Sequence, residues 1–168
     1  MKHWGEQMIF FDGGTGSLLF EAGLAPGVAP ETWNIEHPEV LLDIHRRYFE
    51  AGADIVMANT FGANRLKLGD CGYTPEQVIT AAVQTARRAG QGLVALDIGP
   101  TGKLLAPLGD LDFDDAVDVF AEMVRAGAAA GADVVHIETM SDLYELKAAV
   151  LAAKENASLP VFATVVFD

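Results

Sequence analysis

Cysteine, basic residues and long apolar runs are all scarce in this sequence, and each scarcity excludes a class of protein. Cys71 is the single cysteine among 168 residues, so no disulfide forms within the chain, which suits a reducing compartment. Lys and Arg number 11 against 24 Asp and Glu, and the formal net charge of −13 repels nucleic acid and anionic membranes. We therefore expect no nucleic-acid partner and no membrane partner.

No run approaches the roughly 18 apolar residues that a membrane span needs. The first seven residues, MKHWGEQ, also lack the apolar core of a signal peptide. We therefore expect a cytoplasmic protein. What the chain does have is a hydrophobic content of 51%, enough to bury a sizeable core in one domain.

Short apolar runs rich in β-branched residues predict five strands, at residues 8–12, 54–59, 92–97, 133–138 and 160–168. They are apolar on both faces, which is typical of parallel sheets. Helical patterns fill the intervals, at residues 37–52, 74–90, 113–131 and 141–157. The order βαβαβαβαβ fits either a βα barrel or an open doubly wound sheet.

Two of the helical patterns carry further detail. Thr74 and Gln77 have the spacing of a capping box at the start of the second helix. Leu143, Leu146 and Val150 fall on one face of the last helix, which we expect to be the buried face.

The phrase AGAD occurs twice, at 51–54 and 130–133, each time between a helix and a strand. Its glycine is expected to end the helix in a left-handed conformation, and its alanines allow close packing against the sheet. We interpret this repeat as structural.

Polar residues end four of the predicted strands: Asp12, Asn59, Asp97 and Glu138. The carboxyl ends of parallel strands meet on one side of the sheet, so these side chains are expected to converge on one site. Structural alternatives remain open for three of them, because Asp12 could cap a helix, Asn59 a turn, and Asp97 a loop. Glu138 is harder to explain structurally, because glutamate is a poor strand former and costly to bury unpaired.

The loop after Asp12 reads GGTG and offers backbone N–H groups to an anion. It departs from a dinucleotide fingerprint, because Leu19 stands where the third glycine belongs, and GPTGK at 99–103 is not a P-loop. An N–H cradle beside carboxylates suits a zwitterion, so a free amino acid is the predicted ligand. The histidines show no metal-ligand spacing; His136 is expected in the core and Cys71 as a surface thiol, and no metal site is predicted.

Four segments in register, FFDGGTGSLL, ANTFGAN, DIGPTGKLLAPLG and IETMSDLYELKAAVLAA, resemble the homocysteine S-methyltransferase family. Within it they are most similar to the N-terminal homocysteine-binding domain of cobalamin-dependent methionine synthase, over residues 9–168. The resemblance implies an α/β fold, a (β/α)8 TIM barrel of which residues 1–168 form an incomplete N-terminal part with about five strands and four helices.

The resemblance also implies an activity, in which the thiol of L-homocysteine is deprotonated on zinc and takes a methyl group to form methionine. By motif position it assigns substrate binding to Asp12, Gly13, Gly14, Asn59, Thr60, Asp97 and Glu138. It assigns no catalytic residue.

The chain departs from the family in its zinc ligands. Three cysteines on later strands hold that zinc, and the phrases that carry them are missing here. Zinc and methylcobalamin are therefore expected in a complete enzyme, with the rest of the barrel and the folate and cobalamin domains as partners in the same polypeptide. The fragment alone is expected to be inactive. The alternatives are a betaine- or S-methylmethionine-dependent enzyme, a noncatalytic amino-acid binding module, or a nucleotide-binding doubly wound domain.

Overall fold

The computed structural model describes residues 8–167 and contains one parallel sheet. Its strands are β1 (Ile55–Met57), β2 (Leu93–Ile98), β3 (Val134–Met140) and β4 (Val161–Val165). Their order in the sheet is the order in the chain, β1-β2-β3-β4. A doubly wound sheet reverses its strand order at a switch point, and the described strands have no such reversal. The topology is that of part of a βα barrel.

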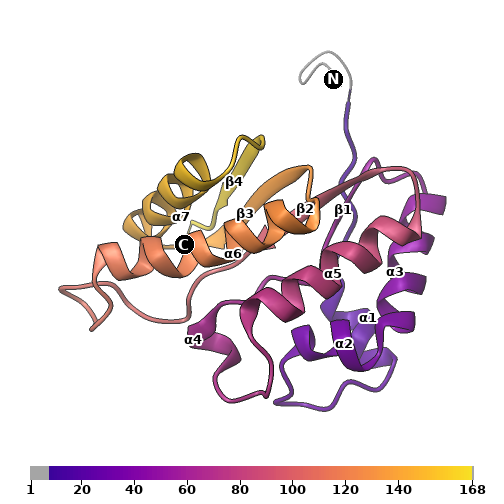
Figure 1. The fold of residues 1–168 in the computed structure, drawn as a ribbon, viewed down its shortest axis with the longest axis horizontal. Coiled ribbons are helices and arrows are strands. Elements are labelled where there is room, and N and C mark those ends of the chain that lie inside the picture. The colour runs from indigo at the N-terminus through magenta and orange to yellow at the C-terminus, as the bar shows by residue number, and fades with distance from the viewer. Residues whose placement is uncertain (1–7, 168) are drawn as a thin grey trace.

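The four long helices lie where the sequence predicts them. They are α3 (Pro38–Glu50), α5 (Pro75–Ala89), α6 (Phe113–Ala130) and α7 (Leu143–Asn156). The capping box of α5 is confirmed, because the N–H of Gln77 donates to Oγ1 of Thr74 and the N–H of Thr74 donates to Oε1 of Gln77. The short elements α1 (Gly16–Glu21), η1 (Pro30–Thr32), α2 (Trp33–Glu36) and α4 (Arg65–Leu68) lie in the connections (Figure 1).

The predicted first strand, at residues 8–12, is not a regular strand. It makes one isolated parallel bridge, between Phe11 and Ile55. Around that bridge the N–H of Ile55 donates to the carbonyl of Phe10 at 3.2 Å, and the N–H of Asp12 donates to the carbonyl of Ile55 at 3.0 Å. The ladder ends there, because the next N–H, that of Met57, donates to the side chain of Asp12. The sheet therefore has four strands instead of the five predicted. Asp168, the last residue of the predicted fifth strand, lies outside the described residues.

The two AGAD phrases end helices as expected. Gly52 and Gly131 have φ values of +103° and +95°, the left-handed conformation that favours glycine. The aspartates that follow have a role that the sequence did not reveal. Oδ2 of Asp54 accepts from the N–H of Phe10 at 3.1 Å, and Oδ2 of Asp133 accepts from the N–H of Val94 at 2.8 Å. Each aspartate thus ties its own strand to the start of the neighbouring segment.

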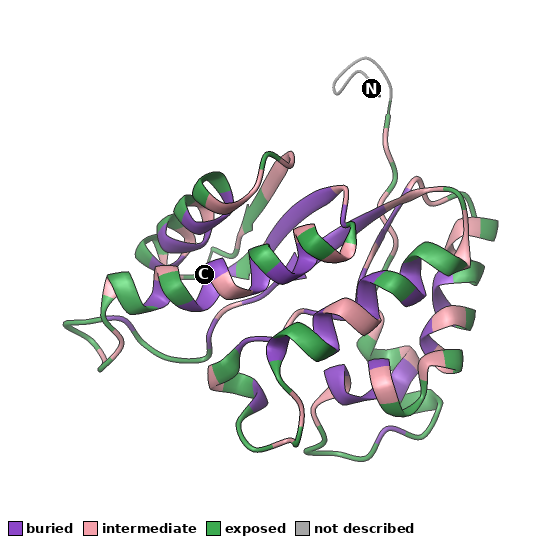
Figure 2. Cartoon of the chain, in the orientation of Figure 1, coloured by how far each residue is buried: buried purple, intermediate pink, exposed green. Residues whose placement is uncertain are grey.

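The core lies mainly between the sheet and α5, α6 and α7, whereas the buried apolar residues of α3 pack in a second cluster with Leu19, Leu24 and Trp33. Alternate strand residues, including Val56, Leu96 and Ile137, pack against these helices. The opposite face carries a smaller cluster around Ile55 and Ala95. Figure 2 shows β2 and β3 largely buried and β4 largely not, because β4 has a strand neighbour on one side only.

The buried face of α7 differs from the prediction. Leu143 is 67% exposed and Leu146 and Val150 are half-buried, whereas four alanines face the core: Ala148, Ala149, Ala152 and Ala153. Small side chains let the helix lie close to β3 and α6, and the larger residues fall on its flanks. No helix within residues 8–167 is both long enough and apolar enough to cross a membrane.

Candidate functional site

A cavity of about 320 Å³ opens at the carboxyl ends of the strands, within the range of small-molecule pockets. Segments from far apart in the sequence form its wall. The residues that line it are Gly13, Gly14, Thr15, Gly16, Pro30, Glu31, Met57, Ala58, Asn59, Phe61, Asp97, Glu138 and Thr139. Five of the seven predicted site residues are in this set.

Two strand ends supply the carboxylates predicted for this site. Asp97 lies on β2 and is 6% exposed, whereas Glu138 lies on β3 and is half-buried. Burial raises the pKa of Asp97 well above its ordinary value, and the nearby charges of Glu138, Asp12 and Glu31 raise that pKa further. Burial also raises the pKa of Glu138. A cation bound among these carboxyls would relieve the repulsion.

Asp12 lies beside this group and not on the cavity wall. Its Oδ2 accepts from the N–H of Met57 at 3.0 Å, and its Oδ1 is buried without a hydrogen-bond partner among the described residues. Burial raises the pKa of Asp12 to about 7, opposed by two backbone hydrogen bonds and assisted by the charge of Glu138. The carboxyls of Asp12 and Glu138 are therefore within electrostatic reach, as the prediction of one common site requires.

The glycine loop forms the side of the cavity next to Asp12. Gly13 and Gly14 line it directly. From behind, the hydroxyl of Tyr48 on α3 donates to the carbonyl of Gly14 at 3.2 Å. This hydrogen bond restricts the loop from the side away from the cavity.

Asn59 and Thr60 mainly hold neighbouring segments in place through hydrogen bonds. The Asn59 amide donates to the carbonyl of Pro30 and to Oδ1 of Asn34, although the residue also borders the cavity. Thr60 is fully buried and does not line it. Its Oγ1 accepts from the N–H of Asp97 at 3.0 Å and donates to the carbonyl of Asp97 at 2.8 Å. Thr60 thus holds the end of β2 next to β1.

The backbone is irregular where β3 delivers Glu138. Thr139 has a φ of +59°, a left-handed conformation that is unfavourable for a β-branched residue. The pairing of β3 with β4 shifts register between Ile137 and Met140. Such local strain is concentrated at functional sites in proteins, and here it borders the cavity.

Sequence reasoning missed two members of this site. Glu31, on η1, lines the cavity and accepts from the N–H of Gly62 at 2.6 Å. Its loop gave no periodic signal. His136 was expected as a hydrogen-bonded core residue, and its ring is indeed mostly buried against Phe11. However, its Nδ1 lies 3.9 Å from Oε2 of Glu138 and 4.0 Å from Oδ1 of Asp97. The alternation of β3 places residues 136 and 138 on one face, and that signal could have found it.

Comparison with known proteins agrees with this geometry. A family model described as homocysteine S-methyltransferase matches residues 9–168. The chain belongs to the homocysteine S-methyltransferase family. It is 34% identical to a methionine synthase of Mycobacterium leprae over 184 residues, covering 97% of this chain and 15% of the relative. It is 36% identical to a methionine synthase of Mycobacterium tuberculosis over 153 residues, covering 82% of this chain and 13% of the relative.

The fold is shared with a solved structure, the metallated form of the homocysteine methyltransferase MmuM from Escherichia coli. The TM-score is 0.82 at 22% sequence identity, covering 97% of this chain and 65% of that chain. The apo form of the same protein gives a TM-score of 0.73. The predicted fold class, part of a barrel in the homocysteine S-methyltransferase family, is confirmed. The chain spans only a small part of the methionine synthases that it matches.

The residues of this chain do not fit a zinc held by three thiolates, as the family resemblance implied. Cys71 is the single cysteine. It lies between α4 and α5, where its Sγ is 3.6 Å from the carbonyl oxygen of Tyr73, and it does not line the cavity. No step of thiol activation is therefore derived for these residues.

Proposed function

We propose that this chain supplies the amino-acid-binding half of a homocysteine S-methyltransferase site. One observation carries the proposal: the buried carboxyl of Asp97, the half-buried carboxyl of Glu138 on the neighbouring strand and a glycine loop border a single cavity at the carboxyl ends of the sheet. A zwitterionic amino acid matches both, because its ammonium group suits the carboxylates and its carboxylate suits the backbone N–H groups.

In the proposed pose, the ammonium group lies near Asp97 and Glu138, with Asp12 adding negative potential from behind the wall. The substrate carboxylate faces the loop at Gly13 and Gly14. Asn59 and Thr60 support this pocket by fixing the loop after β1 and the end of β2. The cavity wall and the hydrogen bonds that hold it support this pose.

Methyl transfer belongs, in this proposal, to a longer polypeptide in which residues 1–168 are the N-terminal part of the barrel domain. Methylcobalamin is the proposed donor, in preference to betaine or S-methylmethionine, because the sequence segments resemble cobalamin-dependent methionine synthase; the matched relatives are methionine synthases. The rest of the barrel, the folate and cobalamin domains and the zinc are partners of that whole enzyme. Without the thiolate ligands, bound homocysteine keeps a thiol pKa near ~8.5, so the isolated chain binds without turnover. A cytoplasmic location stays a prediction.

Calorimetry with L-homocysteine on metal-free protein tests the pocket. We expect saturable binding to the wild type and at least a roughly tenfold weaker affinity for Glu138→Gln, which removes the charge that faces the ammonium group. Two analogues of homocysteine test the contacts of the ammonium group and of the carboxylate separately. We expect weaker binding of 4-mercaptobutanoate, which lacks the amino group, and of 3-mercaptopropan-1-amine, which lacks the carboxylate.

Glu122→Gln is the matched control, because Glu122 lies on the surface of α6 in an ion pair with Arg65. It should bind homocysteine as the wild type does. Equal binding by Glu138→Gln and the wild type would remove Glu138 from the site. Equal binding of 4-mercaptobutanoate and homocysteine would contradict the ammonium subsite altogether.

A further inference from the structure

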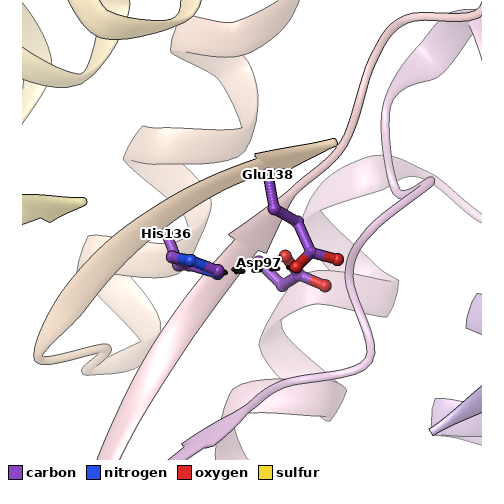
Figure 3. Close-up of side chains that lie close together, drawn as sticks. All are labelled: Asp97, His136 and Glu138. Carbon is purple, nitrogen blue, oxygen red and sulfur yellow. Dashed lines mark ion pairs between the residues drawn. The ribbon is translucent and has the colours of Figure 1, made fainter. Parts of the chain in front are cut away.

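Three ligand atoms of different residues come together beside the cavity. Nδ1 of His136, a carboxylate oxygen of Asp97 and a carboxylate oxygen of Glu138 all lie within 4.8 Å of one another, and the three side chains point toward a common centre (Figure 3). They come from neighbouring strands, and the backbone pairing of Asp97 with His136 fixes their relative height.

A second observation shows that this cluster is incomplete. Asp97 is more than nine-tenths buried, yet its Oδ1 has no hydrogen-bond partner within residues 8–167 and faces the imidazole at 4.0 Å. A buried carboxylate oxygen left without a donor loses its hydration without a replacement, which destabilises the charged form. Neither Glu138 nor neutral His136 supplies a full positive charge to it. The arrangement lacks a cation.

We propose that Asp97, His136 and Glu138 form a binding site for a first-row divalent transition-metal cation, with a coordination position open to the cavity. The site is distinct from the three-thiolate zinc site of the family, because it uses one imidazole and two carboxylates of this chain.

The distances agree with such a site after a small contraction. Ligands in a tetrahedral zinc site, with bonds of about 2.1 Å, lie about 3.4 Å apart. Here Nδ1 of His136 lies 3.9 Å from Glu138 and 4.0 Å from Asp97, and all three ligand atoms lie within 4.8 Å of one another, so side-chain shifts of about 1 Å close the site. Glu138 and Asp97 also line the cavity, so the fourth position faces the space in which a small molecule binds.

The donor set selects among cations. One imidazole nitrogen with two carboxylates suits Zn²⁺, Co²⁺ or Mn²⁺, whereas Mg²⁺ and Ca²⁺ prefer six or more oxygen ligands. Sδ of Met57 lies 3.2 Å from Nδ1 of His136, which places a soft donor beside the same atom. Metal binding needs unprotonated imidazole and carboxylates, so the affinity should increase with pH.

Titration of the metal-free chain with Zn²⁺, followed by calorimetry at pH 7.5 without homocysteine, tests the proposal. We expect one equivalent bound with a micromolar or lower dissociation constant, and an affinity at least about tenfold weaker for both His136→Gln and Glu138→Gln. Co²⁺ should give visible absorption bands of a low-coordinate site with the wild type, and these bands should be lost in His136→Gln and Glu138→Gln. Circular dichroism and thermal melting establish that each variant is folded.

Two controls localise the ion. His37→Gln removes an exposed histidine that pairs with Glu39, and Glu122→Gln removes a carboxylate on α6 that pairs with Arg65; both should bind Zn²⁺ within about twofold of the wild type. The proposal is overturned by the absence of saturable Zn²⁺ binding up to about 1 mM, or by wild-type affinity in folded His136→Gln. It is also overturned by Mg²⁺ binding as tightly as Zn²⁺, which would indicate a site made of carboxylates alone. The homocysteine experiment is done without metal, so the two proposals fail independently.

Discussion

Asp133 and Asp97 lie at opposite ends of the sheet and differ in what surrounds their carboxylates. Asp133 precedes β3, where Oδ2 accepts from the N–H of Val94 at 2.8 Å and Oδ1 pairs with Arg87 at 2.6 Å. Asp97, near the end of β2, is more deeply buried and has one oxygen with no hydrogen-bond partner in the described part of the chain. Oδ1 of Asp12 is likewise buried without a hydrogen-bond partner among the described residues.

The difference reflects two uses of the same side chain. At the amino ends of the strands, each carboxylate completes the hydrogen bonding of the neighbouring segment, and so it stabilises the fold. At the carboxyl ends, several carboxyls repel one another in a poorly solvated place, which costs stability unless a positively charged ligand is bound. Such a cost where several carboxyls meet beside a cavity is typical of a binding site.

The largest expected effect is at the amino ends. Asp133→Ala leaves the fully buried N–H of Val94 without an acceptor and removes the ion pair with Arg87. We expect a loss of about 2–3 kcal/mol in the free energy of unfolding, measured by urea denaturation. Asp54→Ala, at the same place in the other AGAD phrase, should cost about 1 kcal/mol, because the N–H of Phe10 lies in an exposed segment where water replaces the lost bond. Equal losses for both variants would contradict this account of the repeat.

The next largest effect is expected at the carboxyl ends of the strands, where removing a carboxylate should stabilise the folded protein. The pKa of Asp12 is about 7 in the folded protein and 3.8 ordinarily, so between these values the folded state binds more protons than the unfolded state. The stability contributed by that proton is complete below pH 3.8 and is lost as the pH rises through 7. Asp12→Asn keeps an oxygen for the N–H of Met57 and carries no charge. At pH 8 it should therefore be more stable than the wild type by on the order of 2 kcal/mol, and near pH 4.5 this advantage should largely vanish.

Urea denaturation at the two pH values makes this measurement, with Asp115→Asn, an exposed position in the first turn of α6, as the control. A gain that stays the same at both pH values would show that the raised pKa is not its cause. A loss at pH 8 would show that the charged form of Asp12 stabilises the fold, and the contrast between the two ends would then disappear.

Sequence reasoning succeeded where a rule links spacing to geometry. The long helices followed from apolar periodicity and end signals, and the convergence of Asp97 and Glu138 followed from the rule that parallel strands end on one side of a sheet. It failed where neighbours decide the outcome. Residues 8–12 read as a strand, but they pair irregularly with β1. The large residues of α7 read as its core face, but close packing selected its alanines.

The candidate site likewise has features that the sequence predicts and features that it does not. Strand-end carboxylates could be predicted, whereas Glu31 could not, because its place depends on how η1 folds back toward Gly62. His136 was assigned to the core because a lone histidine without ligand spacing is usually structural. Its approach to Asp97 depends on the register between β2 and β3, which pairs the two residues directly. The alternation of β3 puts His136 on the same face as Glu138, but register between distant strands is not encoded in local spacing, so the approach of His136 to Asp97 emerges only in three dimensions.

The smallest effect is expected for substitutions of Thr60. This residue lies next to the candidate site, but its hydrogen bonds stabilise the fold. The family resemblance places it in the pocket, but its hydroxyl is fully buried and bonded to both backbone groups of Asp97. Thr60→Val keeps the shape and removes these bonds, so we expect a loss of about 1 kcal/mol in the free energy of unfolding, and a smaller loss for Thr60→Ser, which keeps the hydroxyl. Homocysteine affinity should decrease less than in Glu138→Gln, because Thr60 positions the end of β2 and does not border the cavity. An affinity loss as large as that of Glu138→Gln, with unchanged stability, would instead indicate that Thr60 contacts the ligand directly.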